Sequence, residues 1–398
     1  MPLSQPKSAS MAFMDVLLRR YPGRFAWFSL RGEAKPEHNP WQVAYASSPL
    51  PKNISRLPGL LRFLNYRVFP YLQAHRATKF AREQGCQVVL ADLAFETVIV
   101  GRLAAKRLGV PLLVNVHDDP VERLRLKKLP KTFLRWYERQ FEKTLRAAQR
   151  VGVISDYMGE AYQQRYGVQT TTLYIGVEAE KCLAPRCPDP SGDCVIITLG
   201  SQNSSQNWVL LIAAVKQLNS WTGRQKFRIL HIGDLSNDLP RSAEVEVTSW
   251  LPEEGFLRQL ERADICFLNS SFDSYNAEVG RLSFPLKVHS YILAQRPILA
   301  LGPEDSAVVR FVRDHQAGTV CTQSELAGDR FAGARDDGRY GSDLASVIQS
   351  LSTDSAQCVS ALAGLARLRE TFNRELFFET FESFIVDVAD HSKIGVMS

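Results

Sequence analysis

Apolar runs of strand length alternate with stretches of helical periodicity along most of the chain. In the first half the apolar runs predict buried strands at Phe25–Leu30, Val88–Leu90, Pro111–Val116 and Arg150–Ile154. Helical spacing predicts helices at Met11–Tyr21, Phe95–Leu108, Lys131–Ala148 and Asp156–Tyr166, the last capped by Ser155 or Asp156. This alternation is typical of parallel sheets flanked by helices.

The same alternation repeats in the second half. Strands are predicted at Cys194–Leu199, Phe227–Ile232, Val245–Thr248, Ile265–Leu268 and Pro297–Ala300. Helices are predicted at Trp208–Asn219, Glu253–Arg262, Leu286–Leu293, Ser306–Asp314 and Phe372–Val386. The pattern predicts an α/β protein with two tandem Rossmann-like, doubly wound domains that face each other across a cleft.

A segment rich in proline and poor in apolar residues separates the two series. It contains Pro185, Pro188, Pro190 and Gly192, a composition typical of interdomain linkers. We therefore predict an N-terminal domain at 1–181, a linker at 182–193, a C-terminal domain at 194–371, and a C-terminal helix and tail at 372–398.

The start of the chain does not fit a doubly wound domain, which usually begins with a buried strand. Met1–Ser10 is polar, and Met11–Tyr21 already has helical spacing. Three explanations stay open: a misassigned start codon, a truncation that exposes a sheet edge, or a domain that is built differently.

Composition supports a globular protein. The 398 residues are too many for one hydrophobic core, and 45% hydrophobic with 23% charged residues exclude disordered and fibrous classes. The chain contains no apolar run long enough to span a membrane, and its polar start lacks a signal-peptide core, so we expect a cytoplasmic protein. We expect the seven cysteines to be reduced, and Cys182, Cys187 and Cys194 are poorly spaced for zinc.

Positive charge is concentrated in one segment. The net charge of the chain is +6, but Arg123–Arg150 alone holds ten basic and two acidic residues, a net +8. Apolar and aromatic residues alternate with these cations, and Leu57–Arg82 repeats the pattern. The segment is either an amphipathic helix that binds anionic lipid at the inner face of the membrane, or a solvated helix whose apolar side packs on its own domain. Motifs for nucleic-acid binding are not found in the sequence.

Several motifs of the second half resemble one enzyme family. They are Ala263–Leu268, Ser283–Leu299, His231–Asp234 and the Gly200–Ser201 pair before the Asn207 helix, together with Val151–Met158 and Leu173–Val177 earlier in the chain. In this combination the sequence resembles GT-B glycosyltransferases of family 4 type.

The resemblance implies that a nucleotide-diphosphate sugar binds the C-terminal domain and an acceptor binds the N-terminal one, with neither cofactor nor metal. The donor-binding candidates are Gly200, Ser201, Gly233, Asp234, Trp250, Leu251, Glu278 and Ser290. Arg281 and Lys287 are catalytic candidates because a departing diphosphate needs cations nearby. His117 is the third, since its family counterpart lies beside the sugar, where it would orient a donor hydroxyl or the acceptor. Asp118 and Asp119 either contact the acceptor or cap the following turn.

Some family positions differ in this chain. The two glutamates that the family carries are Leu282 and Ser290 here, and a basic pair near the first donor-domain strand is Ser201 and Gln206. The resemblance implies a retaining, metal-independent hexosyl-type transferase that extends a glycan or lipid-linked saccharide. A catalytically silent GT-B partner protein and a nucleotide-sugar epimerase remain alternatives.

Overall fold

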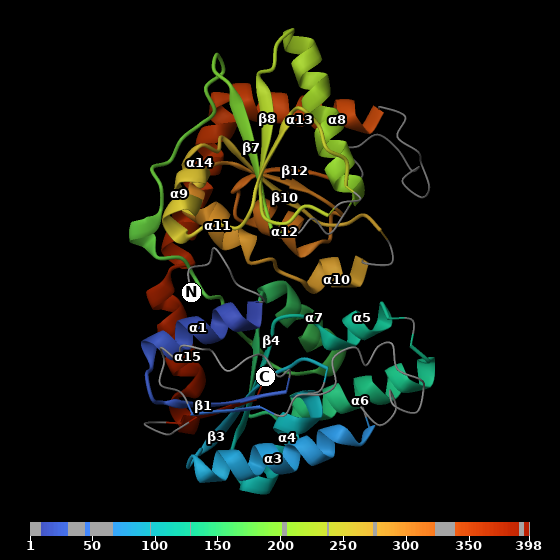
Figure 1. Cartoon of the computed structure of the whole chain (residues 1–398), viewed down its shortest axis with the longest axis vertical. Coiled ribbons are helices and arrows are strands. Elements are labelled where there is room, and N and C mark those ends of the chain that lie inside the picture. The colour runs from blue at the N-terminus through green and yellow to red at the C-terminus, as the bar shows by residue number, and fades with distance from the viewer. Residues whose placement is uncertain are drawn as a thin grey trace. The chain divides into compact units, whose positions relative to one another are not determined.

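The computed structural model describes residues 9–30, 44–47, 67–95, 97–127, 129–200, 205–236, 239–273, 277–322, 339–389 and 394–397. The chain divides into two compact units (Figure 1). The N-terminal unit comprises Ser8–Tyr174 and Phe378–Ser398, and the C-terminal unit comprises Ile175–Phe377. The predicted linker at 182–193 lies inside the C-terminal unit, since the division falls between Tyr174 and Ile175.

The N-terminal unit is built on a seven-stranded parallel sheet of order β2-β1-β13-β3-β4-β5-β6. Its strands are β1 (Phe25–Ser29), β2 (Ala44–Ser47), β3 (Val88–Asp92), β4 (Leu112–Val116), β5 (Arg150–Val153), β6 (Thr171–Thr172) and β13 (Ile394–Met397). Every residue of β1, β3, β4 and β13 is buried, which explains why their sequences are apolar without alternation.

The strand that the start of the chain lacks is supplied by its last residues. Strand β13 lies between β1 and β3 and pairs with both in parallel, Phe25 opposite Ile394 and Val88 opposite Ile394 on the other side. The position is therefore filled, and no sheet edge is exposed there.

Helices of the N-terminal unit cover this sheet. They are α1 (Ala9–Arg20), α3 (Phe69–Glu83), α4 (Thr97–Leu108), α5 (Pro120–Arg125), α6 (Lys131–Ala147), α7 (Asp156–Tyr166) and most of α15 (Arg374–Ala389). Helices α3, α4 and α6 lie side by side as one layer (Figure 1). Helices α1 and α15 pack together where the ring of Phe13 meets that of Phe381 edge-on.

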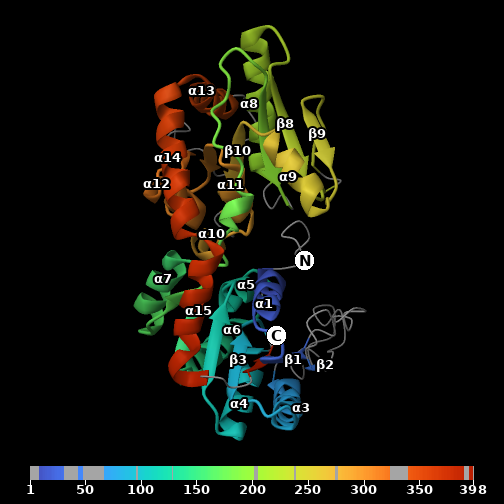
Figure 2. The ribbon, with the colours of Figure 1, turned by 90° about the vertical axis from the view of Figure 1, so that its left-hand side faces the viewer.

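The C-terminal unit has a second parallel sheet, of order β12-β11-β10-β7-β8-β9. The strands are β7 (Cys194–Leu199), β8 (Phe227–Ile232), β9 (Val245–Thr248), β10 (Ile265–Asn269), β11 (Ile298–Leu301) and β12 (Gly318–Cys321). Strand β9 forms one edge beside β8 (Figure 2) and is half-exposed, whereas β10 and β11 are almost wholly buried.

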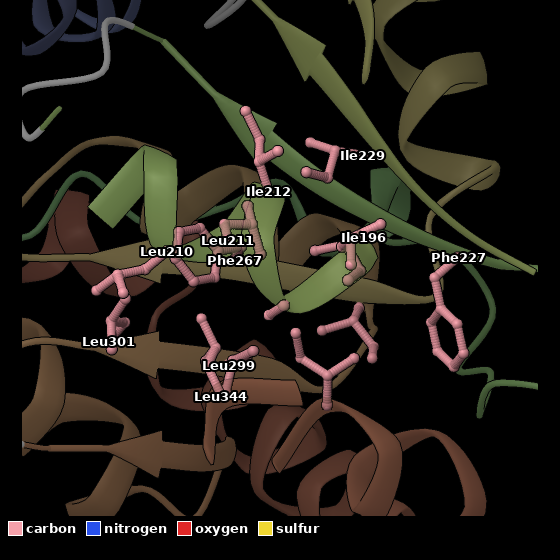
Figure 3. Packing of buried hydrophobic residues seen from close by; sticks show 14 of the residues in the cluster. Ile196, Leu210, Leu211, Ile212, Phe227, Ile229, Phe267, Leu299, Leu301 and Leu344 are labelled. Carbon is pink, nitrogen blue, oxygen red and sulfur yellow. The ribbon is translucent and has the colours of Figure 1, made fainter. Parts of the chain in front are cut away.

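The helices of this unit are α8 (Ser205–Thr222), α9 (Glu253–Glu261), α10 (Ala277–Leu282), α11 (Lys287–Ala294), α12 (Ala307–Asp314), α13 (Arg339–Thr353) and α14 (Ser355–Thr371), with a short 3-10 turn at Ala179–Lys181. Helices α8 and α13 pack on each other and on the sheet. Figure 3 shows the resulting core, in which Leu211 of α8 and Leu344 of α13 approach Phe267 and Leu299 of the sheet. Burial of these side chains is the main force that holds the unit together.

Two connecting segments cross tightly at one side of the C-terminal unit. The backbone N–H of Val177 donates to the carbonyl of Phe372, and the N–H of Arg374 donates to the carbonyl of Val177. Gly176 has a φ of +67°, and a Cβ on it would lie 2.3 Å from the carbonyl oxygen of Asn373. Only glycine fits this crossing.

The expectation that all cysteines are reduced is wrong for one pair. Cys187 and Cys358 form a disulfide that joins the segment before β7 to α14. The other five cysteines form no disulfide, and four of them are buried.

Sequence periodicity located most of the long elements. Strands at 194–199, 227–232 and 245–248 and the helix at 156–166 have the predicted bounds, and Ser155 is the residue that caps this helix. Helix α13 begins at Arg339 inside a stretch rich in glycine, aspartate and arginine whose sequence has little helical periodicity; residues 323–338 lie outside the described part of the chain. No helix of the described residues is long and apolar enough to cross a membrane.

The central place of β13 makes its side chains important for stability. Ile394 is fully buried, so we expect Ile394→Ala to lower the free energy of unfolding of the N-terminal unit by about 2–5 kcal/mol. Urea unfolding followed by circular dichroism measures this change. As a control, Val359→Ala on α14, where the side chain is 62% exposed, should change stability by less than about 0.5 kcal/mol. Equal effects of the two variants would show that β13 is not part of the folded sheet.

Candidate active site

The carboxyl ends of the C-terminal sheet bring several candidates to one edge. Because the strands are parallel, the residues that follow β7, β8, β9 and β10 all lie at this edge. Gly200 follows β7, Gly233 follows β8, Trp250 comes shortly after β9, and Ser270 follows β10. The sequence therefore assembles these donor-binding candidates by topology alone.

Two of the candidate glycines allow neighbouring loops to touch. Gly200 and Gly233 have φ values of +74° and +133°, and a Cβ on Gly233 would lie 3.1 Å from backbone atoms of Gly200. Gly200 and Gly233 therefore meet backbone to backbone at the sheet edge, where their N–H groups donate to the carbonyls of Ile232 and Thr248.

Trp250 and Asp234 form a pair at the same edge. The indole Nε1 of Trp250 donates to a carboxylate oxygen of Asp234 at 3.2 Å. Leu251 beside Trp250 is partly buried. An aromatic ring fixed by a carboxylate is a suitable surface for stacking a planar base.

Arg281 does not present a free cation. Its guanidinium donates to Glu278 at 2.8 Å and lies 3.0 Å from a carboxylate oxygen of Asp305. These acidic neighbours neutralise the positive charge of Arg281, which the sequence predicts to stabilise a departing diphosphate. Glu278 is the same residue that we considered for donor binding, so the structure pairs two of the candidates with each other.

Lys287 differs from Arg281 in having no acidic partner within ion-pair distance among the described residues. Its Nζ donates to the side-chain oxygen of Asn269 at 3.0 Å, at the end of β10. Burial lowers the pKa of Lys287 to about 8, because the ammonium is removed from water without a counter-ion. Binding of an anion would therefore stabilise the Lys287 ammonium more than it would stabilise Arg281, which already has acidic partners.

The remaining donor-side candidates are less accessible or lie elsewhere. Ser290 on α11 is 6% exposed and Leu282 is 3% exposed, so the positions of the two family glutamates are both buried. Gln206 is exposed on α8, and Ser201 lies outside the described residues.

Two histidines of this unit are core residues. His231 at the end of β8 pairs with Thr198 at 2.7 Å, and His289 pairs with the carbonyl of Leu286 at 3.1 Å. Burial lowers the pKa of each imidazole to about 4. Both rings are therefore neutral in the folded protein near pH 7.

In the N-terminal unit, His117 follows β4 and is 7% exposed. Its Nε2 lies 2.9 Å from Nδ2 of Asn115 and 3.6 Å from a carboxylate oxygen of Asp92. The Ser10 hydroxyl donates to the other oxygen of Asp92. Sequence reasoning missed Asp92, Asn115 and Asn269, although each lies at or next to the carboxyl end of a strand, which is the signal that could have indicated them.

Asp118 and Asp119 have separate environments. Asp118 is exposed and pairs with Arg123 at 2.9 Å. Asp119 is the N-cap of α5 and accepts from the backbone N–H groups of Val121 and Glu122, while its second oxygen accepts from the Tyr162 hydroxyl at 3.0 Å. Burial raises the pKa of Asp119. Its carboxylate is thus used to hold the loop that carries His117.

The described residues contain no cluster of three or more histidine, cysteine or acidic side chains that could hold a metal ion.

Comparison with solved structures identifies the fold class. A sucrose-phosphate synthase from Thermosynechococcus elongatus aligns with a TM-score of 0.60 at 13% identity, over 95% of this chain and 92% of that one. An α,α-trehalose-phosphate synthase (UDP-forming) from Burkholderia xenovorans, in complex with glucose-6-phosphate, aligns at 0.61 and 11% identity over 96% and 97%. The trehalose-6-phosphate synthase OtsA aligns at 0.64 and 12% identity over 97% and 96%. The chain has the GT-B fold.

Part of the chain matches the sequence model of one family. Residues 25–181 match the sequence model of the family described as Glycosyltransferase Family 4. These findings confirm the resemblance to GT-B glycosyltransferases of family 4 type. The matched residues belong almost wholly to the N-terminal unit, whereas most of the motifs that carry the resemblance, among them Ala263–Leu268 and Ser283–Leu299, lie in the C-terminal unit. No curated protein sequence matches the chain significantly.

The buried histidines predict acid sensitivity of the C-terminal unit. The folded pKa of about 4 lies below the unfolded value of 6.5, so between these values the unfolded chain binds more protons and stability falls as the pH falls. By pH 5 we expect each histidine to account for a loss of about 1–2 kcal/mol relative to pH 7.5. Urea titrations at both pH values measure the loss.

The double variant His231→Gln and His289→Gln isolates this contribution, because glutamine does not titrate. It should reduce the difference in unfolding free energy between the two pH values. A pH dependence as steep as that of the wild type would show that other groups cause the acid sensitivity.

Proposed function

We propose that this protein transfers a sugar from a nucleotide-diphosphate donor to a glycan or lipid-linked saccharide, as a hexosyl-type transferase with retention and without a metal. The family match and the GT-B fold support transfer of a sugar, and the carboxyl edge of the C-terminal sheet is where we place the donor. The acceptor would then bind the N-terminal unit near His117.

Lys287 is the observation that carries this proposal. In the transfer, the bond between the anomeric carbon and the diphosphate breaks while a bond to the acceptor oxygen forms, and negative charge builds on the leaving phosphate. The Lys287 ammonium has no acidic partner in the described residues and lies at the edge where that charge would develop. It would supply the positive charge that a metal ion supplies in other enzymes, while the acceptor proton leaves to a departing phosphate oxygen.

The Trp250 and Asp234 pair and the Gly200 and Gly233 loops would complete the donor site. The indole would stack on the base, and the glycines that follow β7 and β8 would keep side chains away from the phosphate groups. Uridine is the first base to test, since one solved structure with this fold is a UDP-forming synthase. The chain has Ser290 where the family has a glutamate, so a weaker ribose contact is expected.

Nucleotide binding tests the donor site. In a thermal-shift series with UDP, GDP, ADP, CMP and TDP, we expect one nucleotide to raise the unfolding midpoint, and Lys287→Met to weaken its binding at least about tenfold. Binding should be full below pH 8 and weaken above it, because the free lysine loses its proton there. Lys216→Met, on the exposed side of α8, is the matched control.

Two outcomes would contradict the donor site. Unchanged nucleotide binding by Lys287→Met would remove Lys287 from it, whereas no shift with any nucleotide would favour a catalytically silent GT-B protein. Conversion of the sugar nucleotide without any acceptor would favour the epimerase alternative.

A second proposal concerns the exposed side of α6. The apolar side of this helix is used within the unit: Tyr137 donates to the carbonyl of Phe95 at 2.9 Å, and Phe141 packs on Tyr162 and Tyr166. The opposite side presents a row of exposed cations one turn apart, which we call the α6 row: Lys131, Arg135, Arg139 and Lys143. The α6 row has no ion-pair partner among the described residues.

A row of like charges one turn apart destabilises a helix unless anions accompany it. Next to the row, Arg67 at the start of the α3 region stacks on Trp136 of α6 at 4.3 Å. Tyr71 and Leu72 on α3 are 44% and 57% exposed, which adds apolar surface near these cations. We propose that this face contacts anionic lipid peripherally, at the cytoplasmic side, where a lipid-linked acceptor would be presented.

Vesicle binding tests the α6 row. The protein should co-sediment with vesicles containing phosphatidylglycerol but not with neutral vesicles, and binding should weaken as salt rises. Changing the four residues of the α6 row to glutamine should reduce binding at least about tenfold, at about 1 kcal/mol per cation. A control variant removes four exposed cations of the other unit: Lys216, Arg224, Arg258 and Arg367. Equal losses in both variants would contradict a specific surface.

A further inference from the structure

The environment of His117 determines which of its nitrogens carries the proton. Asn115 lies next to the carboxyl end of β4, opposite Asp92 of β3 on one side and Gly152 of β5 on the other. Its side chain is 1% exposed. A Cβ on Gly152 would lie 2.9 Å from the Asn115 side-chain oxygen, so the absence of a side chain at Gly152 is what makes room for this amide. The strands therefore hold Asn115 in one place.

The Asn115 amide donates to His117. Its Nδ2 lies 2.9 Å from Nε2 of the imidazole, and an amide NH₂ is a donor only. Nε2 must then accept with its lone pair, so in the neutral ring the proton is on Nδ1. The ring of Phe13, edge-on at 5.1 Å, keeps the imidazole from rotating.

Nδ1 of His117 is a buried donor that lacks an acceptor among the described residues. Leaving such a group unpaired costs about 1–3 kcal/mol, which a ligand oxygen would recover. Asp92 indicates the kind of oxygen: its carboxylate is 3.6 Å from the same ring and would repel a phosphate. An uncharged hydroxyl suits this site.

We propose that Asn115 is a positioning residue that holds neutral His117 in the Nδ1–H form, so that Nδ1 donates to a sugar hydroxyl of the donor or acceptor. The identity of this ligand rests on the proposed transferase function; the tautomer does not. Asp92, fixed by the Ser10 hydroxyl, accompanies the ring as a counter-charge when it becomes protonated.

Nitrogen spectra of the whole protein test the tautomer directly. With ¹⁵N-labelled histidine, two-bond proton–nitrogen correlations distinguish the protonated nitrogen from the bare one, and the loss of one set of signals in His117→Gln assigns the ring. At about pH 8, where an ordinary imidazole is neutral, we expect the His117 proton on Nδ1. A wild-type spectrum with the proton on Nε2 overturns the proposal without any variant.

Asn115→Asp supplies the second measurement. Aspartate has the same shape but only accepts hydrogen bonds, so the proton should move to Nε2. Asp118→Asn, the exposed neighbour, should leave the His117 signals where they are. A proton that stays on Nδ1 in a folded Asn115→Asp protein shows that Asn115 does not set the tautomer, and the proposal fails.

Kinetics separate this inference from the transferase proposal. With the sugar nucleotide whose nucleotide stabilises the protein, Asn115→Asp should lower kcat at least about tenfold and leave nucleotide binding unchanged, since that site is on the other unit. If the protein binds a nucleotide but the wild-type spectrum shows the His117 proton on Nε2, this inference is overturned and the transferase proposal is not. If no nucleotide binds but the proton is on Nδ1, the transferase proposal is overturned and the tautomer is established.

Discussion

The hydrogen bonds of β13 are the constraint on which the N-terminal unit depends. This strand of four residues pairs with β1 on one side and β3 on the other. Without it, the facing backbone groups of two buried strands would lack partners, and no water could reach them. Asp92 ends β3 beside it, and Asn115 pairs with Asp92 from β4, the next strand of the sheet. The surroundings of His117 are thus held in place by residues nearly 300 positions away in the sequence.

Charge compensation separates the two cations that the sequence places near the donor. Arg281 and Lys287 are equivalent in a charge count, but the fold surrounds Arg281 with Glu278 and Asp305 and gives Lys287 a neutral amide. The same distinction holds in the N-terminal unit. The Asp119 carboxylate accepts the backbone hydrogen bonds that cap α5, whereas the Asp92 carboxylate lies beside the imidazole of His117. Partners, and not residue types, decide which charged groups are available to a substrate.

Sequence patterns located the elements whose residues are uniformly buried. Strand 194–199 and strand 227–232 were bounded correctly because parallel strands covered on both faces are continuous apolar runs. The four residues of β13 are too few for such a signal, and nothing local shows that they pair with residues from the start of the chain. The strand pattern also indicated that the residues after β7 and β8 lie at one edge, since strand ends in a parallel sheet converge.

The contacts of individual side chains could not be predicted in this way. Whether Arg281 is neutralised, or which nitrogen of His117 is protonated, depends on atoms from strands and helices far apart in the sequence. The disulfide between Cys187 and Cys358 shows the same limit, because its cysteines are separated by 171 residues. Neither composition nor spacing indicates that these two sulfurs meet.

The position of β13 also affects how the protein is made. All strands of the C-terminal sheet lie between residues 194 and 321, so that sheet can form while the ribosome is still adding later residues. The N-terminal sheet, although its other strands are synthesised first, has to wait for residues 394–397. Until then β1 and β3 are nascent edges without a partner, open to chaperones and to wrong pairing. Domains usually mature in the order of their synthesis, and in this chain the order is reversed.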